Sequence, residues 1–72
     1  MRLRNRLRAI RHEKQLTQKA LAEAVGITRQ TAIAIEKGTH APSVRLALEL
    51  AQTLDVRLED IFWLEIEHEE ER

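Results

Sequence analysis

The sequence has no cysteine, one proline, two glycines and only two aromatic residues, Phe62 and Trp63. Without cysteine the chain can form neither a disulfide nor a thiolate metal site, so helix packing, helped by any self-association, has to supply the stability. A chain of 72 residues buries only about 60% of the surface that its unfolded form exposes. We therefore expect a single domain with a small core that folds in a reducing cytoplasm.

Long apolar runs are absent as well, and so is an excess of charge of either sign. No stretch approaches the roughly 20 apolar residues of a membrane span, and Met1 is followed by alternating arginines instead of an apolar signal region. We expect no membrane segment and no export signal. The charges balance but are segregated, with ten basic against three acidic residues in 1–45 and two against nine in 46–72. Because exposed charges act over only about 10 Å at ordinary salt, the basic half can still attract an anionic partner.

Apolar residues recur at the helical spacing of three and four in five segments of the chain. In the first, about residues 5–14, Asn5 is a candidate N-cap. Its apolar side holds Leu7 and Ile10, and its other side holds three arginines, Arg6, Arg8 and Arg11. This pattern predicts a short helix with one basic side.

The next two segments are short and are bounded by capping residues. Thr17 opens a helix that ends at Gly26, and Thr28 opens a helix that ends at Gly38. The apolar residues of the first of these helices are Ala20, Leu21, Ala24 and Val25, and those of the second are Ala32 and Ile35.

Ser43 opens a fourth helix after a loop over residues 38–42. This helix has the widest apolar stripe, which consists of Val44, Leu46, Ala47, Leu50, Ala51 and Leu54. A fifth, short helix is expected from about Leu58 to Phe62 or Trp63. Its first turn holds Glu59 and Asp60, where the helix dipole favours anions. We expect one aromatic residue to close the base of the core and the other to be partly exposed.

Residues 1–4 and 64–67 both alternate apolar and charged side chains with the period of two that is typical of strands. Antiparallel pairing would set Arg2 and Arg4 near Glu65 and Glu67 on one face. On the other face Leu3 would lie near Leu64 or Ile66. A two-stranded ribbon is marginal in water, so it would need the helices beneath it or a second ribbon from another protomer. The alternative is a frayed start and a solvated acidic tail. We place the domain at residues 1–66 and an acidic tail at residues 67–72.

Residues 17–38 read TQKALAEAVGITRQTAIAIEKG and fit two helices that cross steeply through a tight turn. The crossing needs a small residue at Ala22 and a residue free to adopt a positive φ at Gly26. It also needs an apolar inner face, here Leu21, Val25, Ile27, Ala32 and Ile35. The outer side chains include hydrogen-bonding groups suited to base edges and phosphates; they are Gln18, Thr28, Arg29, Gln30, Thr31, Ile33, Ala34 and Lys37.

These features resemble the helix-turn-helix family of phage Cro and cI repressors and bacterial Xre-type regulators, over roughly residues 5–64. The resemblance is carried by four runs, Leu16-Thr17-Gln18, Thr28-Arg29-Gln30-Thr31, Ile35-Glu36-Lys37-Gly38 and Pro42-Ser43. It implies an all-α, five-helix bundle of the lambda-repressor-like type. In that fold the third helix enters the major groove of double-stranded DNA, while the second crosses the backbone.

The resemblance also implies roles for single residues. Gln18 matches a position that contacts phosphate and braces the recognition helix. The positions that meet base edges correspond to Arg29, Gln30 and Ala34; arginine suits guanine and glutamine suits adenine. Two threonines would cap the recognition helix and reach phosphate, namely Thr28 and Thr31. The residues beyond this helix that would hold the sugar-phosphate backbone are Lys37, Thr39 and His40.

The chain departs from the family pattern at one point. The family has a bulky Ile or Val where this chain has Ala32, and a small polar residue where it has Ile33. If the helix keeps its usual pose, Ile33 faces outward and can meet a thymine methyl group. If the helix rotates, Ile33 fills the core, and Arg29 and Gln30 shift their aim. The sequence leaves both alternatives open.

No residues suggest catalysis or a cofactor. The three histidines, His12, His40 and His68, are not at metal-ligand spacing, and no nucleophile lies beside a base. We expect a cytoplasmic, sequence-specific transcriptional regulator, nucleoid-associated in a prokaryote or a phage-infected cell. It would be a repressor that binds a pseudo-palindromic operator as a homodimer, with an exposed Trp beside an apolar ribbon as a natural dimer contact. The alternative is an antitoxin or adaptor on the same fold, whose main partner is another protein.

Overall fold

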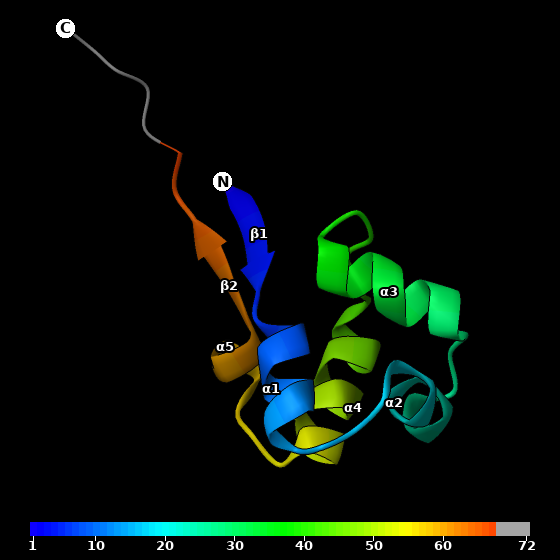
Figure 1. Cartoon of the computed structure of the whole chain (residues 1–72). Helices are drawn as coiled ribbons and strands as arrows, with labels where there is room; N and C mark the ends of the chain where they lie inside the picture. Colours follow the sequence, from blue (N-terminus) through cyan, green and yellow to red (C-terminus); the bar gives the residue numbers. More distant parts are fainter. Residues whose placement is uncertain (68–72) are drawn as a thin grey trace, which may run out of the picture.

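Five short helices and one two-stranded ribbon make up the computed structural model, which describes residues 1–67 (Figure 1). The elements in chain order are β1 (Arg2–Asn5), α1 (Leu7–Glu13), α2 (Gln18–Val25), α3 (Arg29–Lys37), α4 (Val44–Leu54), α5 (Leu58–Ile61) and β2 (Phe62–Glu65). The expected five-helix bundle with a terminal ribbon is confirmed. Within residues 1–67, no helix has the length and apolar character that crossing a membrane requires.

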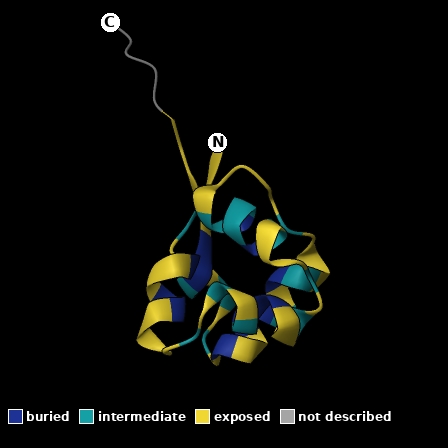
Figure 2. Ribbon diagram, turned by 45° about the vertical axis from the view of Figure 1, so that its right-hand side comes forward, coloured by how far each residue is buried: buried dark blue, intermediate teal, exposed yellow. Residues whose placement is uncertain are grey.

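The core lies between the helices, and each of the five contributes to it (Figure 2). Its fully buried side chains are Leu7, Leu21, Ile35, Leu50, Leu54 and Ile61. Burying one such side chain contributes roughly 1.5–3 kcal/mol. Phe62 closes this core and is 8% exposed, whereas Trp63 is 40% exposed, so one aromatic residue is inside and the other partly outside, as expected.

Two residues of the expected apolar stripes are exposed. Val44, the first residue of α4, is 75% exposed. Ala24 is exposed too, and Ala22 of the same helix is buried instead. Helices α2 and α3 therefore approach each other closely at Ala22, where a small residue was expected.

The helix ends follow the capping pattern. The side-chain oxygens of Thr17, Thr28 and Ser43 each accept a hydrogen bond from a backbone N–H of the first helical turn, at 3.0–3.1 Å; such a cap is typically worth about 1 kcal/mol. Gly26 and Gly38 end their helices in the left-handed conformation, with φ of +73° and +85°. These boundaries match the sequence expectation.

The start of α1 corrects the expectation for Asn5. The helix begins at Leu7 with Arg6 as its N-cap, and Arg6 makes no side-chain capping bond. Asn5 is the last residue of β1, yet its Oδ1 still accepts a hydrogen bond from the Leu7 N–H at 2.9 Å. Its Nδ2 donates to the Ile35 carbonyl at 3.0 Å, so Asn5 caps from inside the strand and ties the ribbon to α3.

Helix α5 is shorter than expected because Phe62 already belongs to β2. Glu59 and Asp60 lie in its first turn, as the sequence indicated. The Asp60 carboxylate accepts a hydrogen bond from the Arg57 N–H at 3.0 Å. That bond, assisted by the charge of the Arg57 side chain, lowers the pKa of Asp60 below its ordinary value of 3.8.

The chain termini pair as an antiparallel ribbon that projects from the bundle (Figure 1). Arg2 lies opposite Glu65 and Leu3 opposite Leu64, as predicted. The strand β2 starts two residues earlier than expected, however, and Arg4 therefore lies opposite Trp63 and not near Glu67.

The shift has a local cause. The Arg6 N–H donates to the Ile61 carbonyl at 2.9 Å, which fixes the register just before Phe62. Arg4 still makes an ion pair, with Glu65 at 2.8 Å. Both side chains are about half exposed, so this pair contributes at most about 1 kcal/mol. His68 and most of the expected acidic tail lie outside the described residues.

Candidate nucleic-acid interface

The segment that carries the sequence motif folds into two helices joined by a tight turn. The turn occupies residues 26–28 between α2 and α3. It is closed by hydrogen bonds from the backbone N–H groups of Gly26 and Ile27 to the Ala22 carbonyl, the arrangement that a left-handed C-terminal residue permits. Ala22 and Ala32 are both buried, which lets the two helices approach closely.

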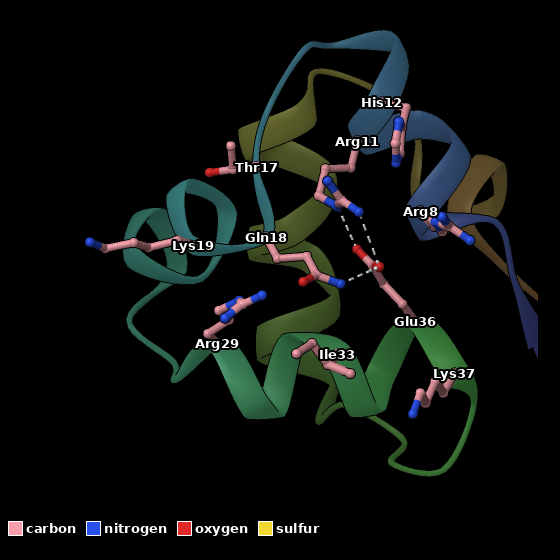
Figure 3. A pocket seen from close by; sticks show the side chains of 10 residues that line it. All are labelled: Arg8, Arg11, His12, Thr17, Gln18, Lys19, Arg29, Ile33, Glu36 and Lys37. Atoms are coloured by element: carbon pink, nitrogen blue, oxygen red, sulfur yellow. Dashed lines mark hydrogen bonds and ion pairs between the residues drawn. The ribbon is translucent and has the colours of Figure 1, made fainter.

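Helices α1, α2 and α3 border an open hollow of about 840 Å³ (Figure 3). Four of its lining residues are cations that form no ion pair with any residue of the described chain, 1–67. They are Arg8, Lys19, Arg29 and Lys37, and each is exposed. An open, basic hollow of this kind attracts an anion such as the sugar-phosphate backbone.

One face of α3 forms a wall of this hollow. Arg29, Ile33 and Lys37 follow one another at intervals of four residues, which places them in a single row along the helix. Figure 3 shows this row, with Gln18 from the start of α2 beside it. Gln18, Arg29, Ile33 and Lys37 are thus the expected site residues that the structure brings together around this hollow.

The position of Ile33 decides between the two poses that the sequence left open. Ala32 and Ile35 are each 1% exposed and fill the inner side of α3. Ile33 is only half-buried, lines the hollow, and is not among the residues packed against the core. The helix therefore keeps the pose in which Ile33 faces outward.

A buried ion pair holds α3 in place. Arg11 Nε donates to Glu36 Oε2 at 2.6 Å and Arg11 Nη2 donates to Glu36 Oε1 at 3.3 Å, with side chains only 8% and 5% exposed. Arg11 Nη1 also donates to the Leu16 carbonyl at 2.8 Å, and Gln18 Nε2 donates to Glu36 Oε1 at 3.3 Å (Figure 3). One network thus joins α1, the following loop, α2 and α3.

This network corrects the sequence interpretation of Arg11, which was grouped with the exposed arginines of α1. Arg11 follows the buried Ile10 and stands four residues after the buried Leu7, so it lies toward the core. Glu36 follows the buried Ile35 in the same way. Glu36 is the one acidic residue of α3 and adjoins the buried Ile35, which was the available signal for a buried partner but did not identify Arg11.

The remaining expected residues lie elsewhere on α3 or beyond it. Thr28 Oγ1 caps the helix and lies 3.0 Å from Thr31 Oγ1. The Thr39 hydroxyl donates to the Ala34 carbonyl at 3.2 Å. Gln30 is exposed, Ala34 is half-buried, and His40 lines a second hollow between the ribbon and the loop after α3.

Sequence reasoning missed part of the basic rim. Arg8 and His12 line the hollow from α1, and Thr17 and Lys19 line it from the start of α2. Arg8 and His12 are four residues apart, and both are exposed, on the side of the helix away from Leu7 and Ile10. This spacing on the exposed side of α1 was the sequence signal that could have identified Arg8 and His12 as part of the site. In the described part of the chain, no three His, Asp or Glu side chains are grouped so as to hold a metal ion.

Comparison with known proteins agrees with this geometry. A model of the helix-turn-helix family matches residues 7–61. The chain is 42% identical over 66 residues to the uncharacterised HTH-type transcriptional regulator YgzD of Bacillus subtilis, covering 92% of this chain and 100% of that protein. It is 50% identical over 64 residues to an uncharacterised HTH-type transcriptional regulator of Methanothermobacter thermautotrophicus, covering 88% and 93%.

A solved structure shows the same likeness. The restriction-modification controller protein C.AhdI of Aeromonas hydrophila superimposes with a TM-score of 0.70 and 33% identity, covering 75% of this chain and 78% of that one.

Proposed function

The chain belongs to the helix-turn-helix family of transcriptional regulators, and from this premise we propose that it binds specific DNA sequences and is not an enzyme. The observation that carries the proposal is the row of Arg29, Ile33 and Lys37 along the outer face of α3. A helix with such a row fits the major groove, where base edges are distinguishable.

Residues near the front of α3 read the bases in this proposal. Arg29 is the first residue of α3 and is exposed, so its guanidinium reaches the O6 and N7 of a guanine, a contact worth about 1–3 kcal/mol of discrimination. Gln30 forms the corresponding pair of hydrogen bonds with the N6 and N7 of an adenine. Ile33 presents an apolar side chain to a thymine methyl group, and Ala34 keeps the helix close to the base edges.

The phosphates on either side of the groove are held by different groups. On one side, Gln18 has a free amide hydrogen besides the one that it donates to Glu36, and Thr28 and Thr31 stand at the N-terminus of α3, which favours anions. On the other side, Lys37 and His40 are exposed. The Thr39 hydroxyl also contacts phosphate in this proposal, because it can donate its hydrogen bond to a phosphate oxygen instead of to the Ala34 carbonyl.

The finer proposal is a cytoplasmic repressor that binds a pseudo-palindromic operator as a homodimer. Two copies related by a twofold axis present two recognition helices about one turn of DNA apart, or 10–10.5 bp. Occupation of an operator by such a dimer is enough to block a polymerase. An apolar region outside the DNA-facing hollow supports pairing of two copies.

Selection of duplexes from a random library, at moderate salt because phosphate binding weakens as salt rises, tests this function. We expect the protein to enrich an inverted repeat with half-sites about 10 bp apart. The variant Arg29→Ala should lose preference at a base pair in each half-site. The control Arg57→Ala removes the same charge from an exposed side chain away from the hollow and should select the same repeat. Absence of any enriched sequence would overturn the proposal and favour a protein-interaction role.

A further inference from the structure

The second hollow adjoins the basic hollow at the C-terminal end of α3. It has a volume of about 520 Å³ and is bordered by β1 and by the loop after α3, residues 38–42, which stands next to β1 (Figure 1). The two hollows share two lining residues, Glu36 and Lys37. They are therefore neighbouring parts of one surface that continues from α3 onto the ribbon.

This surface carries positive charge and no free negative charge. Glu36 is the single acidic residue that lines either hollow, and its carboxylate is buried against Arg11. Arg2 and Lys37 line the second hollow, are exposed, and form no ion pair with any residue of the described range 1–67. His40 lines it as well and is exposed. The second hollow is thus suited to an anion, as the basic hollow is.

The ribbon itself leaves Arg2 without a counter-charge. Glu65 lies directly opposite Arg2 in the register, yet Glu65 Oε1 accepts a hydrogen bond from Arg4 Nη1 at 2.8 Å. The pair therefore runs diagonally across the ribbon. An arginine that is not paired in this way can offer its planar fork of N–H groups to a pair of phosphate oxygens.

Two hydrogen bonds fix the position of β1 beside α3. Asn5 Nδ2 donates to the Ile35 carbonyl in the last turn of α3 at 3.0 Å, and the Arg6 N–H donates to the Ile61 carbonyl at 2.9 Å. Arg2 stands three residues before Asn5 on a strand, which rises about 3.3 Å per residue. Arg2 therefore extends the basic surface by about 10 Å from this anchor point.

The continuity of the two hollows indicates which anion fits. Lys37 borders both of them, and the proposed function places a phosphate there. A small anion would fill a single hollow. Each strand of a DNA duplex, in contrast, carries a phosphate about every 3.4 Å along its axis. A backbone that passes Lys37 therefore presents further phosphates to Arg2.

We propose that Arg2 of the ribbon is a further DNA-binding residue, which holds the sugar-phosphate backbone in the second hollow beside Lys37 and His40. This inference rests on the proposed function, because it extends the DNA-facing surface of that proposal from α3 onto β1. Arg2 contacts phosphate and not a base edge, so it contributes affinity equally for every sequence.

Fluorescence anisotropy of the full chain, on a duplex that carries one selected half-site with flanking base pairs on both sides, tests the inference over a series of salt concentrations. Arg2→Gln removes the charge, and Arg2→Lys keeps it. The control Arg45→Gln removes the same charge from a side chain that is 88% exposed and lines neither hollow. Circular dichroism checks that each variant keeps the helix content of the wild type.

We expect Arg2→Gln to weaken binding about three- to tenfold at about 0.1 M salt, by the same factor on the selected and on a scrambled duplex. The slope of log affinity against log salt should become shallower by about one. Arg2→Lys should keep the slope of the wild type, and Arg45→Gln should keep both its slope and its affinity.

Replacement of single phosphates by neutral methylphosphonates locates the contact on the DNA. At least one replacement should weaken binding of the wild type but not of Arg2→Gln, because the partner of that phosphate is already absent. Exchange of chloride for inorganic phosphate at constant ionic strength should leave the difference between wild type and Arg2→Gln in place. Its disappearance would assign the second hollow to a small anion and overturn the inference.

Two further results would overturn the inference. The first is an Arg2→Gln variant with the affinity and salt slope of the wild type, and the second is an identical set of sensitive phosphates with and without Arg2. In either case a wild type that prefers the selected duplex, and an Arg29→Ala variant that loses this preference, would leave the proposed function intact. A wild type with no preference between duplexes would instead remove the proposed function.

Discussion

The basic hollow and the region of the ribbon and the first half of α4 differ in how the chain holds them. Around the basic hollow, buried polar contacts fix the elements, above all the Arg11–Glu36 pair with Gln18 attached to it. At the ribbon and the first half of α4, apolar side chains such as Leu64 and Val44 are exposed, and the Arg4–Glu65 ion pair is about half exposed.

The two arrangements are suited to different kinds of ligand. Reading bases requires side chains held at fixed positions, since a shift of the recognition helix moves every contact at once. A second protein surface can instead cover and order an apolar groove as it binds. The basic hollow therefore suits a ligand that needs contacts at fixed positions, and the exposed apolar side chains suit contact with a second protein surface.

The largest effect is expected from the variant Glu36→Leu, which tests whether the hollow is fixed by its buried ion pair. It leaves the Arg11 guanidinium buried without a counter-charge, so the free energy of unfolding should fall by about 3–5 kcal/mol. Urea denaturation followed by circular dichroism measures this loss. In the other region, Arg4→Ala breaks an exposed pair and should cost less than about 1 kcal/mol.

A double variant sharpens this test. Arg11→Met combined with Glu36→Leu removes both buried charges, so it should be more stable than Glu36→Leu alone. If Glu36→Leu and Arg4→Ala cost the same, the two regions would not differ as described.

The left-handed turn between α2 and α3 gives the next effect. A Cβ at Gly26 meets no atom within 4 Å, so substitution is opposed by the backbone conformation, φ +73°, and not by crowding. Gly26→Val should cost about 1–3 kcal/mol, and Gly26→Asn less, because asparagine tolerates this conformation. Thermal unfolding of both variants checks the order, and a smaller loss for Val than for Asn would contradict it.

The variant Arg29→Ala tests whether side chains at the hollow distinguish DNA sequences. It should weaken binding to the selected duplex by about 1–3 kcal/mol and relax base preference. Gln18→Ala should weaken binding more evenly across duplexes, since its proposed contact is to phosphate. Fluorescence anisotropy on the selected and a scrambled duplex separates the two effects. Equal losses from both variants on every duplex would show that the recognition face is elsewhere.

The smallest effect concerns Asp60, which lies in the first turn of α5. Its pKa is lowered, first by the hydrogen bond from the Arg57 N–H, so its stabilising contribution is present above its ordinary value of 3.8 and is lost as the pH falls through the lower folded value. Asp60→Asn should therefore be slightly less stable than wild type at pH 7. Urea titrations from pH 7 to pH 3 should show this difference shrink on acidification, and a difference that grows would contradict the assignment.

Local signals predicted most of the fold. Thr17, Thr28 and Ser43 as N-caps, and Gly26 and Gly38 as helix ends, follow from the chemistry of single residues and are all found. The ribbon was also predictable, since its period of two differs from the helical pattern around it. The sequence left its register open between Leu64 and Ile66 opposite Leu3, because the Arg6 to Ile61 hydrogen bond that fixes it joins residues far apart in the sequence.

The candidate site was predictable where it depends on one helix. The row of Arg29, Ile33 and Lys37 follows from helical spacing alone, although the outward pose of Ile33 became clear only from the packing of its neighbours. The Arg11–Glu36 pair was missed because it links α1 to α3, and sequence gives no distance between two helices. The roles of single residues toward DNA remain proposals.

The most direct test of the central claim is a nuclear magnetic resonance titration of the ¹⁵N-labelled chain with the selected duplex. We expect amide shifts at low DNA concentration to concentrate at the start of α2 and along α3, around Gln18, Arg29, Ile33 and Lys37. The amides of Val44, Leu48 and Leu64 should be little affected. Shifts centred on the ribbon and α4, with α3 unchanged, would contradict the assignment of the basic hollow as the DNA-binding surface.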